Sequence, residues 1–342
     1  MIYGHGDNAY LYGDKVKYDF STNIPCFADL NELKQHLASR LDVIGSYPEP
    51  EARHLEEFIA QKEGIAPQQV MVTAGTTEAI YLVAQLYRGR TSIITQPTFS
   101  EYEDACKMHG HIISYYDNDD MEQLPNAQLY WLCNPNNPTG KAIQKELIGN
   151  AIHHHQQSIF VIDQAYEDYS MKAVFRPSEL QDIHNVILLH SLTKRYCIPG
   201  LRIGYITASP AIISRLRLLR QPWTVNALAI EAGKYLLGTR AEVLPNRHAY
   251  LEEAQRLHTE LNKLDGLLLI ESDANFMLAY LQQSTASELQ TWLLNHHGIL
   301  IRDASNFHGL DSHYFRVAAQ TREADDLLIS AIADYLCLMS SS

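Results

Sequence analysis

Residues 191–205, SLTKRYCIPGLRIGY, lie between two segments that read as buried strands and carry three cations in an otherwise apolar region. These cations are Lys194, Arg195 and Arg202, with Gly200 and Gly204 on either side of the last. Burying a cation costs several kcal/mol unless an anion meets it or it reaches solvent. The stretch therefore indicates a site for an anionic ligand, in a protein whose own formal net charge is −13.

The chain around this stretch alternates between strand and helix patterns. Short runs rich in β-branched and aromatic residues are separated by helical or turn segments: QVMVTAG, TSIITQ, HIISYYD, QLYWLCN, SIFVIDQAY, NVILLHS and RIGYITA. This alternation predicts an α/β fold, with a mostly parallel sheet of the seven-stranded type between helices. Sheets of this kind bind ligands at the carboxyl ends of their strands.

The pattern changes after about residue 222, where helical segments come before the strand-like runs LLLIESDANFMLAYL, ILIRDAS and YFRVAAQ. A helical segment, READDLLISAIADYLCL, follows them. We predict a large domain over residues 41–225 and a smaller α+β domain built from residues 1–40 and 226–342.

Composition excludes several classes of protein. The acidic balance disfavours nucleic acid and anionic membranes as partners, because both attract basic faces. No apolar run reaches the ~18 residues of a transmembrane helix, and the first residues lack the pattern of a signal peptide. The five cysteines are scattered without a CxxC pair, and the three histidines at 153–155 would point apart on a helix. We expect a cytoplasmic protein with no metal site.

Polar residues follow four of the predicted strands. After QVMV, Gly75 occupies a turn before Thr76 and Thr77, whose backbone N–H groups open a helix and can bind an anion. An ordinary helix cap explains the same residues. After LYWLC, the two prolines of NPNNPTG make a rigid turn that fixes the amide of Asn137, where it could donate to a ligand oxygen.

The next two strand ends carry a carboxylate and an amine. Asp163 is costly at the end of an apolar strand unless a cation pairs with it, and Tyr166 follows three residues later. Lys194 in a partly desolvated pocket can form a Schiff base, and Ser191 and Arg202 flank it. Pyridoxal 5′-phosphate accounts for all four strand ends, because it needs a phosphate cradle, an acid beside its ring nitrogen, donors to its 3-oxygen and an amine for its aldehyde.

NPNNPTG, DQAY and SLTKRYCIPGLRIGY, in this order, resemble the signature of the class I and II aminotransferases, pyridoxal-phosphate enzymes of the aspartate aminotransferase fold. The resemblance covers nearly the whole chain. It implies that Lys194 forms the Schiff base and moves the proton at the substrate's α-carbon, and that Asp163 holds the proton of the ring nitrogen. It also implies the remaining contacts: Asn137 and Tyr166 to the 3-oxygen, and Gly75, Thr76, Thr77, Ser191 and Arg202 around the phosphate.

Three further assignments follow from the same resemblance. Phe99 in QPTFSEY, or else Tyr102, would stack on the cofactor ring. Arg316 in RVAA would bind the substrate's α-carboxylate through two parallel hydrogen bonds. Tyr47 in GSYPEPEARHLEEF would reach the cofactor phosphate of a neighbouring subunit, which implies a homodimer with shared active sites.

Family membership leaves the reaction open, because loss of the α-proton leads to transamination and loss of the carboxylate to decarboxylation. The chain resembles two branches that act on phosphorylated amino acids or amines, the threonine-phosphate decarboxylases of cobalamin side-chain synthesis and the histidinol-phosphate aminotransferases. GHGDNAY, YDFSTNIP and LIRDASNFHGLDSHYFRVAAQ favour the decarboxylase. They make His5, Asn23 and Arg302 candidates for binding the substrate's phosphate or carboxylate.

Some features keep the alternatives open. NIPCF lacks the Asn-Pro-Leu-Gly turn usual in the decarboxylase branch, so a histidinol-phosphate type or related amino-acid aminotransferase is the alternative. Arg302 can also be interpreted as a solvated cation on an edge strand. A non-catalytic regulator with this fold is disfavoured, because Lys194 is present.

Overall fold

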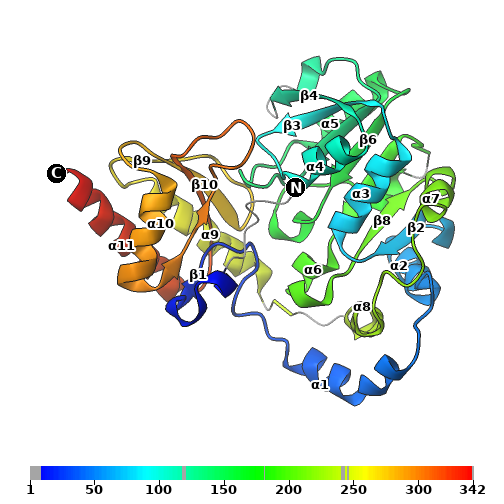
Figure 1. The fold of residues 1–342 in the computed structure, drawn as a ribbon, viewed down its shortest axis with the longest axis horizontal. Helices are drawn as coiled ribbons and strands as arrows, with labels where there is room; N and C mark the ends of the chain where they lie inside the picture. Colours follow the sequence, from blue (N-terminus) through cyan, green and yellow to red (C-terminus); the bar gives the residue numbers. More distant parts are fainter. Residues whose placement is uncertain (1–8, 118–120, 181, 240–242, 245, 341–342) are drawn as a thin grey trace.

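The structure is a computed structural model that describes residues 9–117, 121–180, 182–239, 243–244 and 246–340. Two lobes lie side by side (Figure 1). We call the one with a seven-stranded sheet the large lobe and the one with a four-stranded sheet the small lobe. The blue strand β1 lies with the yellow-to-red elements of the small lobe, so that lobe combines segments from both ends of the chain (Figure 1).

The large-lobe sheet has the strand order β2-β8-β7-β6-β5-β3-β4. β8 runs antiparallel to both of its neighbours and the other pairs are parallel, which confirms the prediction of a mostly parallel sheet. Each strand lies within one of the predicted apolar runs. Their bounds are β2 (Val70–Thr73), β3 (Thr91–Gln96), β4 (Ile112–Asp117), β5 (Leu129–Cys133), β6 (Ile159–Asp163), β7 (Val186–His190) and β8 (Gly204–Ala208).

Helices cover both faces of this sheet. Successive residues of a strand point to opposite faces, so neighbouring residues of one strand pack against different helices. Along β5, Trp131 belongs to a core cluster with residues of α3, α4 and α7, whereas Tyr130 and Leu132 belong to another with residues of α5. The helices of the large lobe are α2 (Arg53–Glu63), α3 (Thr76–Leu86), α4 (Glu101–Met108), α5 (Lys145–His154), α6 (Leu192–Arg195) and α7 (Pro210–Arg217).

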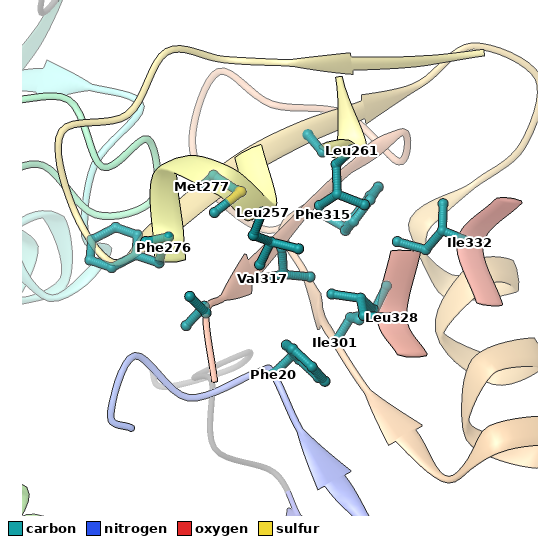
Figure 2. Close-up of a cluster of buried hydrophobic side chains, with 14 of the residues drawn as sticks. Phe20, Leu257, Leu261, Phe276, Met277, Ile301, Phe315, Val317, Leu328 and Ile332 are labelled. Carbon is teal, nitrogen blue, oxygen red and sulfur yellow. The ribbon is translucent and has the colours of Figure 1, made fainter. Parts of the chain in front are cut away.

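The small lobe is an antiparallel sheet in the order β12-β13-β10-β9, with helices on one face. Figure 2 shows the apolar side chains that converge between the sheet and these helices, among them Phe315, Val317 and Leu328. Phe20, which follows β1, joins this core. The elements are β1 (Tyr18–Asp19), α9 (Arg247–Leu261), β9 (Leu267–Leu269), β10 (Phe276–Leu281), α10 (Ala286–His297), β11 (Ile299–Leu300), β12 (Arg302–Asp303), β13 (Tyr314–Ala318) and α11 (Arg322–Ser340).

Two helices lie below the large lobe in Figure 1, α1 (Asn31–Ser39) and α8 (Ala227–Thr239). Leu33 of α1 and Ala229 of α8 share a buried cluster with Leu55 of α2 and with Val70 and Tyr205 of the large-lobe sheet. Residues on both sides of the predicted boundary at 225 therefore pack together, and the division into 41–225 against 1–40 and 226–342 stays a prediction.

Short 3-10 helices complete the fold: Ala9–Leu11, Gly13–Lys15, Leu41–Gly45, Pro67–Gln69, Met121–Gln123, Glu167–Tyr169, Pro177–Leu180 and Pro199–Leu201. Within the described ranges, none of the helices has both the length and the apolar character needed to cross a membrane. The same residues contain no group of three or more His, Cys, Asp or Glu side chains arranged to hold a metal ion.

Candidate active site

A cavity of about 260 Å³ lies at the carboxyl ends of β5, β6 and β7, with residues of both lobes in its wall. The predicted residues that line it are Thr76, Thr77, Phe99, Tyr102, Asn137, Asp163, Tyr166, Ser191, Lys194 and Arg202 from the large lobe, and Asn23 and Arg316 from small-lobe segments. The structure thus brings together side chains from segments that are up to 293 residues apart, the separation of Asn23 and Arg316.

The carboxylate of Asp163 is buried at the end of β6, with only 3% of the residue exposed. Its Oδ1 accepts a hydrogen bond from the N–H of Ala165 at 2.9 Å, and its Oδ2 accepts one from the hydroxyl of Tyr102 at 2.9 Å. Burial raises the pKa of Asp163 to about 6, although both hydrogen bonds act in the opposite direction. A cationic ligand group beside this carboxylate would lower its pKa and stabilise its charge.

The two aromatic candidates, Phe99 and Tyr102, differ in what surrounds them. Tyr102 is fully enclosed, stacks on Trp131 with ring centroids 5.7 Å apart, and donates its hydroxyl to Asp163. Phe99 is partly exposed and meets Tyr102 edge-on, with centroids 5.8 Å apart and ring planes at 85°. Because Trp131 already covers the ring of Tyr102, the geometry favours Phe99 as the ring that meets a planar ligand.

Asn137 lies in the turn after β5 and contacts the small lobe. Its Oδ1 accepts a hydrogen bond from Nη1 of Arg316 at 2.5 Å, which leaves the NH₂ group of the amide to donate to a ligand. Gly140, at the end of the same turn, has a φ of 77°, and a Cβ there would overlap the hydroxyl of Ser272 and the carbonyl oxygen of Phe276. The turn therefore packs backbone to backbone against the small lobe.

Arg316 is a buried guanidinium at the wall of the cavity. Its neighbours on β13, Phe315 and Val317, belong to the core beneath the helices, so its own side chain extends from the opposite face of the sheet. Nη2 donates to the carbonyl oxygen of Ser21 at 2.7 Å, whereas Nε is buried without a hydrogen-bond partner. Burial lowers the pKa of Arg316 to about 10.

Arg302 lies directly across from Arg316, as its partner in the β12–β13 pairing. β12 is the edge strand that the solvated interpretation supposed, but Arg302 is only 7% exposed, so that interpretation is wrong. Burial, together with the charge of Arg316, lowers the pKa of Arg302 to about 10. Two buried like charges side by side are costly, and an anion between them would offset that cost.

Tyr166 and Asn23 join the large lobe to the segment that follows β1. The hydroxyl of Tyr166 accepts a hydrogen bond from Nδ2 of Asn23 at 3.1 Å, while Oδ1 of Asn23 is buried without a partner. Burial raises the pKa of Tyr166 to about 12. The phenol therefore keeps its proton near neutral pH and can donate it to a ligand oxygen.

Lys194 extends from α6, the short helix after β7. Ser191 is the N-cap of this helix, and its Oγ accepts a hydrogen bond from the N–H of Lys194 at 3.3 Å. The Lys194 Nζ lies 5.8 Å from the centroid of the Tyr166 ring and lines the cavity. Arg195, the neighbouring cation, points elsewhere and pairs with Asp168, with its Nε 3.5 Å from a carboxylate oxygen.

The first turn of α3 and Arg202 form a cradle for an anion. Gly75 precedes the helix with a φ of 86°, and a Cβ there would lie 2.8 Å from Nη2 of Arg202, so the guanidinium lies against this backbone. Thr76 and Thr77 open α3 and line the cavity. A helix N-terminus with a guanidinium beside it offers N–H donors and positive charge to a phosphate.

Among the predicted residues that the structure describes, Arg302 and Gly75 adjoin lining residues without lining the cavity themselves, and Tyr47 lies away from it. Tyr47 is 85% exposed and packs against Trp223, with ring centroids 5.3 Å apart, beside a different hollow of the surface. His5 falls outside the described residues, so the structure does not address the interpretation that it binds substrate.

The sequence profile of the family described as "Aminotransferase class I and II" matches residues 15–332 of this chain. The chain belongs to this family. A solved structure similar to it is that of an L-threonine-O-3-phosphate decarboxylase from Porphyromonas gingivalis, which is 38% identical, with a TM-score of 0.91 over 93% of this chain and 99% of that one.

Curated relatives from two branches of the aminotransferase family match this chain at the same percentage identity, and the decarboxylase match covers more of both chains. A threonine-phosphate decarboxylase from Salmonella typhimurium is 32% identical over 93% of this chain and 91% of its own length. A histidinol-phosphate aminotransferase from a Thermoanaerobacter species is 32% identical over 86% of this chain and 85% of its own. The two branches are those that the sequence motifs indicate.

The cavity of this aminotransferase-family chain fits pyridoxal phosphate, the cofactor of the family. Asp163 is a buried carboxylate whose raised pKa calls for a cation such as a protonated ring nitrogen. The cradle at Gly75 and Arg202 suits a phosphate. The buried atoms without partners, Oδ1 of Asn23 and Nε of Arg316, are polar groups that a ligand and substrate would satisfy.

Sequence reasoning missed a partly buried histidine–glutamate pair whose charges act on Asp163. His190 ends β7 and is 1% exposed, and its Nδ1 lies 3.1 Å from a carboxylate oxygen of Glu167. Its Nε2 lies 3.2 Å from the hydroxyl of Thr207. The charge of His190 lowers the pKa of Asp163 and that of Glu167 raises it. A histidine as the last residue of an apolar strand is the signal in the sequence that could have found this pair.

Proposed function

We propose that this chain is a pyridoxal-phosphate-dependent decarboxylase of a phosphorylated amino acid, with L-threonine O-3-phosphate as its substrate. The observation that carries the proposal is the pair of buried guanidiniums, Arg302 and Arg316, side by side at the edge of the small-lobe sheet. A substrate with both a carboxylate and a phosphate supplies an anion for each arginine, in the forked geometry that guanidinium prefers.

The comparisons add support, because the Porphyromonas gingivalis structure that resembles this chain at 38% identity is named a decarboxylase of this amino acid. The second candidate is an aminotransferase of the histidinol-phosphate type, which the 32% identity to the Thermoanaerobacter protein favours. Histidinol phosphate has a phosphate but no carboxylate, so it would leave one guanidinium of the pair without an anion in that half of the reaction.

We assign the chemistry to the cavity residues as follows. When bound, pyridoxal phosphate accepts the electron pair released as a bond at the substrate's α-carbon breaks. Arg302 and Arg316 would orient the substrate so that the bond to the carboxylate, rather than the bond to hydrogen, stands perpendicular to the ring. Carbon dioxide would leave, and Lys194 would return one proton to the α-carbon.

The surrounding residues would hold the cofactor for this step. Asp163 would keep the ring nitrogen protonated, and Asn137 and Tyr166 would donate to the 3-oxygen. Phe99 would cover the ring, while Gly75, Thr76, Thr77, Ser191 and Arg202 would bind the phosphate. Asn23, together with His5, would complete the substrate side.

We also propose that two copies of the chain form a homodimer that shares its active sites, in the cytoplasm. The segment before α2 exposes apolar side chains: Leu41 is 50% exposed, Ile44 69% and Tyr47 85%. Trp223 beside Tyr47 is 47% exposed. Apolar and aromatic groups of this kind are typical of a surface that a second subunit covers. In the dimer, Tyr47 would reach the cofactor phosphate of the partner chain.

A direct assay separates the two reactions. The protein loaded with pyridoxal phosphate is incubated with L-threonine O-3-phosphate and carbon dioxide is measured. In parallel it is incubated with histidinol phosphate and 2-oxoglutarate, and glutamate is measured. We expect carbon dioxide without glutamate, and no product in either assay from Lys194→Ala.

If glutamate forms and carbon dioxide does not, the proposed decarboxylase activity is wrong and the protein is an aminotransferase of the histidinol-phosphate type. An Arg302→Ala variant refines the result, because loss of one guanidinium should raise KM for the phosphorylated substrate by roughly tenfold or more. If KM stayed the same, Arg302 would lie outside the binding site.

A further inference from the structure

The connection between β12 and β13, residues 304–313, reaches the large lobe. It begins two residues after Arg302 and ends three residues before Arg316, so it closes the hairpin that carries both guanidiniums. Phe307 anchors it: this ring is 5% exposed and packs with Leu278, the cross-strand partner of Arg316. We call this segment the 304–313 loop.

The 304–313 loop holds the guanidinium of Arg302 in place. Nη2 of Arg302 donates to Oδ1 of Asn306 at 2.6 Å, and the guanidinium carbon lies 5.5 Å from the centroid of the Phe307 ring. Nη1 donates to the carbonyl oxygen of Asp303 at 2.5 Å. The direction in which Arg302 points therefore depends on where this loop lies.

Two residues after Asn306, the loop contacts the large lobe through His308. Its ring stacks on Tyr115 of β4, with centroids 3.8 Å apart and planes at 17°. Its Nδ1 lies 3.8 Å from a carboxylate oxygen of Glu103 on α4, which also pairs with Lys107 and accepts a hydrogen bond from the Tyr115 hydroxyl. This contact joins the β12–β13 hairpin to two elements of the other lobe.

The contact adjoins the site. A second cavity, of about 240 Å³, is lined by Asn306, His308 and Tyr115, and also by Phe99, which lines the main cavity as well. The loop and the large-lobe surface thus enclose a region that shares the Phe99 ring with the main cavity. A movement of the loop away from Tyr115 would change both the position of Arg302 and the enclosure of this region.

We propose that His308 and Asn306 are positioning residues for the phosphorylated substrate. Stacking of His308 on Tyr115 fixes the 304–313 loop against the large lobe, and Asn306 ties Arg302 to the fixed loop, so the guanidinium is aimed before the substrate arrives. The two residues act through Arg302 and contact neither the cofactor nor the reacting bond. The inference rests on the proposed function, in that Arg302 binds an anionic group of the substrate.

The test compares four variants as holoenzymes: His308→Ala, Asn306→Ala, His308→Phe and Ser305→Ala. Equilibrium binding of L-threonine O-3-phosphate and of L-threonine is measured in a Lys194→Ala background, which should not consume the ligand, and kcat and KM are measured with Lys194 present. We expect His308→Ala and Asn306→Ala to bind the phosphorylated ligand about 3- to 10-fold more weakly, the range that one aromatic pair or one hydrogen bond to a charged group supplies. Binding of L-threonine and kcat should change by less than about twofold.

The other two variants are controls. His308→Phe keeps a flat ring for Tyr115 and should retain most of the affinity, whereas Ser305 is an exposed residue of the same loop and its replacement should change nothing. Unchanged binding in both alanine variants would overturn the proposal. So would an equal loss for both ligands accompanied by a fall in kcat, because that pattern indicates general damage to the site.

The test of His308 and Asn306 can succeed or fail independently of the decarboxylase assignment. If the wild-type enzyme releases no carbon dioxide but transaminates histidinol phosphate, the decarboxylase assignment fails. The same variants are then tested for binding of histidinol phosphate against histidinol, and a loss confined to the phosphorylated ligand still supports the positioning role.

Discussion

The two sides of the cavity are built in different ways. On the large-lobe side, Asp163 ends β6 and Lys194 follows β7, and the pairing of these adjacent strands fixes how far apart their ends lie. On the small-lobe side, Asn23 follows β1 and Arg316 lies on β13. These segments meet through the small-lobe core (Figure 2) and through single hydrogen bonds, such as the one that the N–H of Ala318 donates to the carbonyl oxygen of Phe20 at 3.0 Å. A continuous strand ladder sets the spacing on the first side, whereas core packing and single hydrogen bonds set it on the second.

This difference assigns separate tasks to the two sides. The large-lobe side offers the groups that suit the cofactor, which must stay fixed through every turnover. The small-lobe side offers paired guanidiniums that suit the substrate, which must enter and leave. Substitutions on the first side should therefore affect the chemistry or the cofactor, and those on the second should affect which substrate is accepted and how tightly.

The largest effect is expected for Lys194→Ala. Removal of the amine takes away the group that we assign to proton transfer, so kcat should fall by at least about 10³-fold, within the range of general acid–base catalysis. Treatment with borohydride should fix the cofactor covalently to the wild-type chain and not to the variant. Unchanged turnover in the variant would show that Lys194 does not take part in the reaction, and the division of tasks between the two sides would then be wrong.

Arg316→Ala should produce the next largest effect. The substitution removes an anion partner of the substrate and leaves Oδ1 of Asn137 and the carbonyl oxygen of Ser21 without their donor. We expect kcat/KM to fall by about 100-fold, with most of the change in KM. Arg316→Lys keeps the charge and loses the fork, so it should recover only part of the activity. An effect on kcat alone would assign Arg316 to the chemical side.

Asp163→Asn should have opposite effects on the free and the loaded protein. The pKa of Asp163 in the folded chain, about 6, lies above the ordinary value of 3.8. The cofactor-free folded state thus binds more protons than the unfolded state between these values, and its stability falls as the pH rises through that window. An amide has no such penalty, and its NH₂ group can donate to the oxygen of Tyr102 while its oxygen accepts from Ala165.

Without cofactor, the variant should be more stable than the wild type by about 3 kcal/mol at about pH 7.5, and most of this gain should be lost near pH 4. Urea unfolding at both pH values measures this. The same variant should release pyridoxal phosphate more readily in dialysis, because the ring nitrogen loses its counter-charge. A variant that is less stable at both pH values would show that packing, rather than charge, dominates at this position.

Tyr166→Phe should give the smallest effect, and it probes the boundary between the two sides. The change removes one donor to the ligand and the acceptor for Nδ2 of Asn23. We expect a loss of about 1 kcal/mol, or roughly fivefold in cofactor affinity, with KM nearly constant. A larger shift in KM than in cofactor affinity would show that Asn23 depends on this phenol for its position.

The large-lobe side was predictable from the sequence because buried parallel strands are apolar runs. A polar residue at the end of such a strand is costly to bury unless it has a partner, so it indicates a ligand. Asp163, Asn137 and Lys194 carry that signal individually. The closely spaced strands also predict that these residues lie near one another, since the carboxyl ends of parallel strands share one edge of the sheet. Pattern alone therefore reached the chemistry of the cofactor.

The small-lobe side could not be predicted in this way. Arg316 and Asn137 are 179 residues apart, and no periodicity links them, so only the family resemblance pointed to Arg316. For Arg302 the sequence left two interpretations open, a substrate-binding residue and a solvated cation on an edge strand. Pattern could not decide between them, because its burial depends on Phe307 and the rest of the 304–313 loop, which cover it from outside the strand. Likewise, a helical period indicates that α8 is a helix but not that it packs with α2 beside the large lobe.

A substitution at Gly140 would change how the two lobes contact each other, although Gly140 is not one of the residues that we assign to a ligand. A single methyl group added there would act as a wedge between the lobes, because it would overlap a backbone carbonyl that cannot rotate away as well as the hydroxyl of Ser272. The small lobe would have to retreat, and Arg316 would be drawn from Asn137, while the strand ends that suit the cofactor kept their spacing. Replacing one hydrogen atom of the glycine would thus separate the two sides of the cavity without changing any residue that we assign to a ligand.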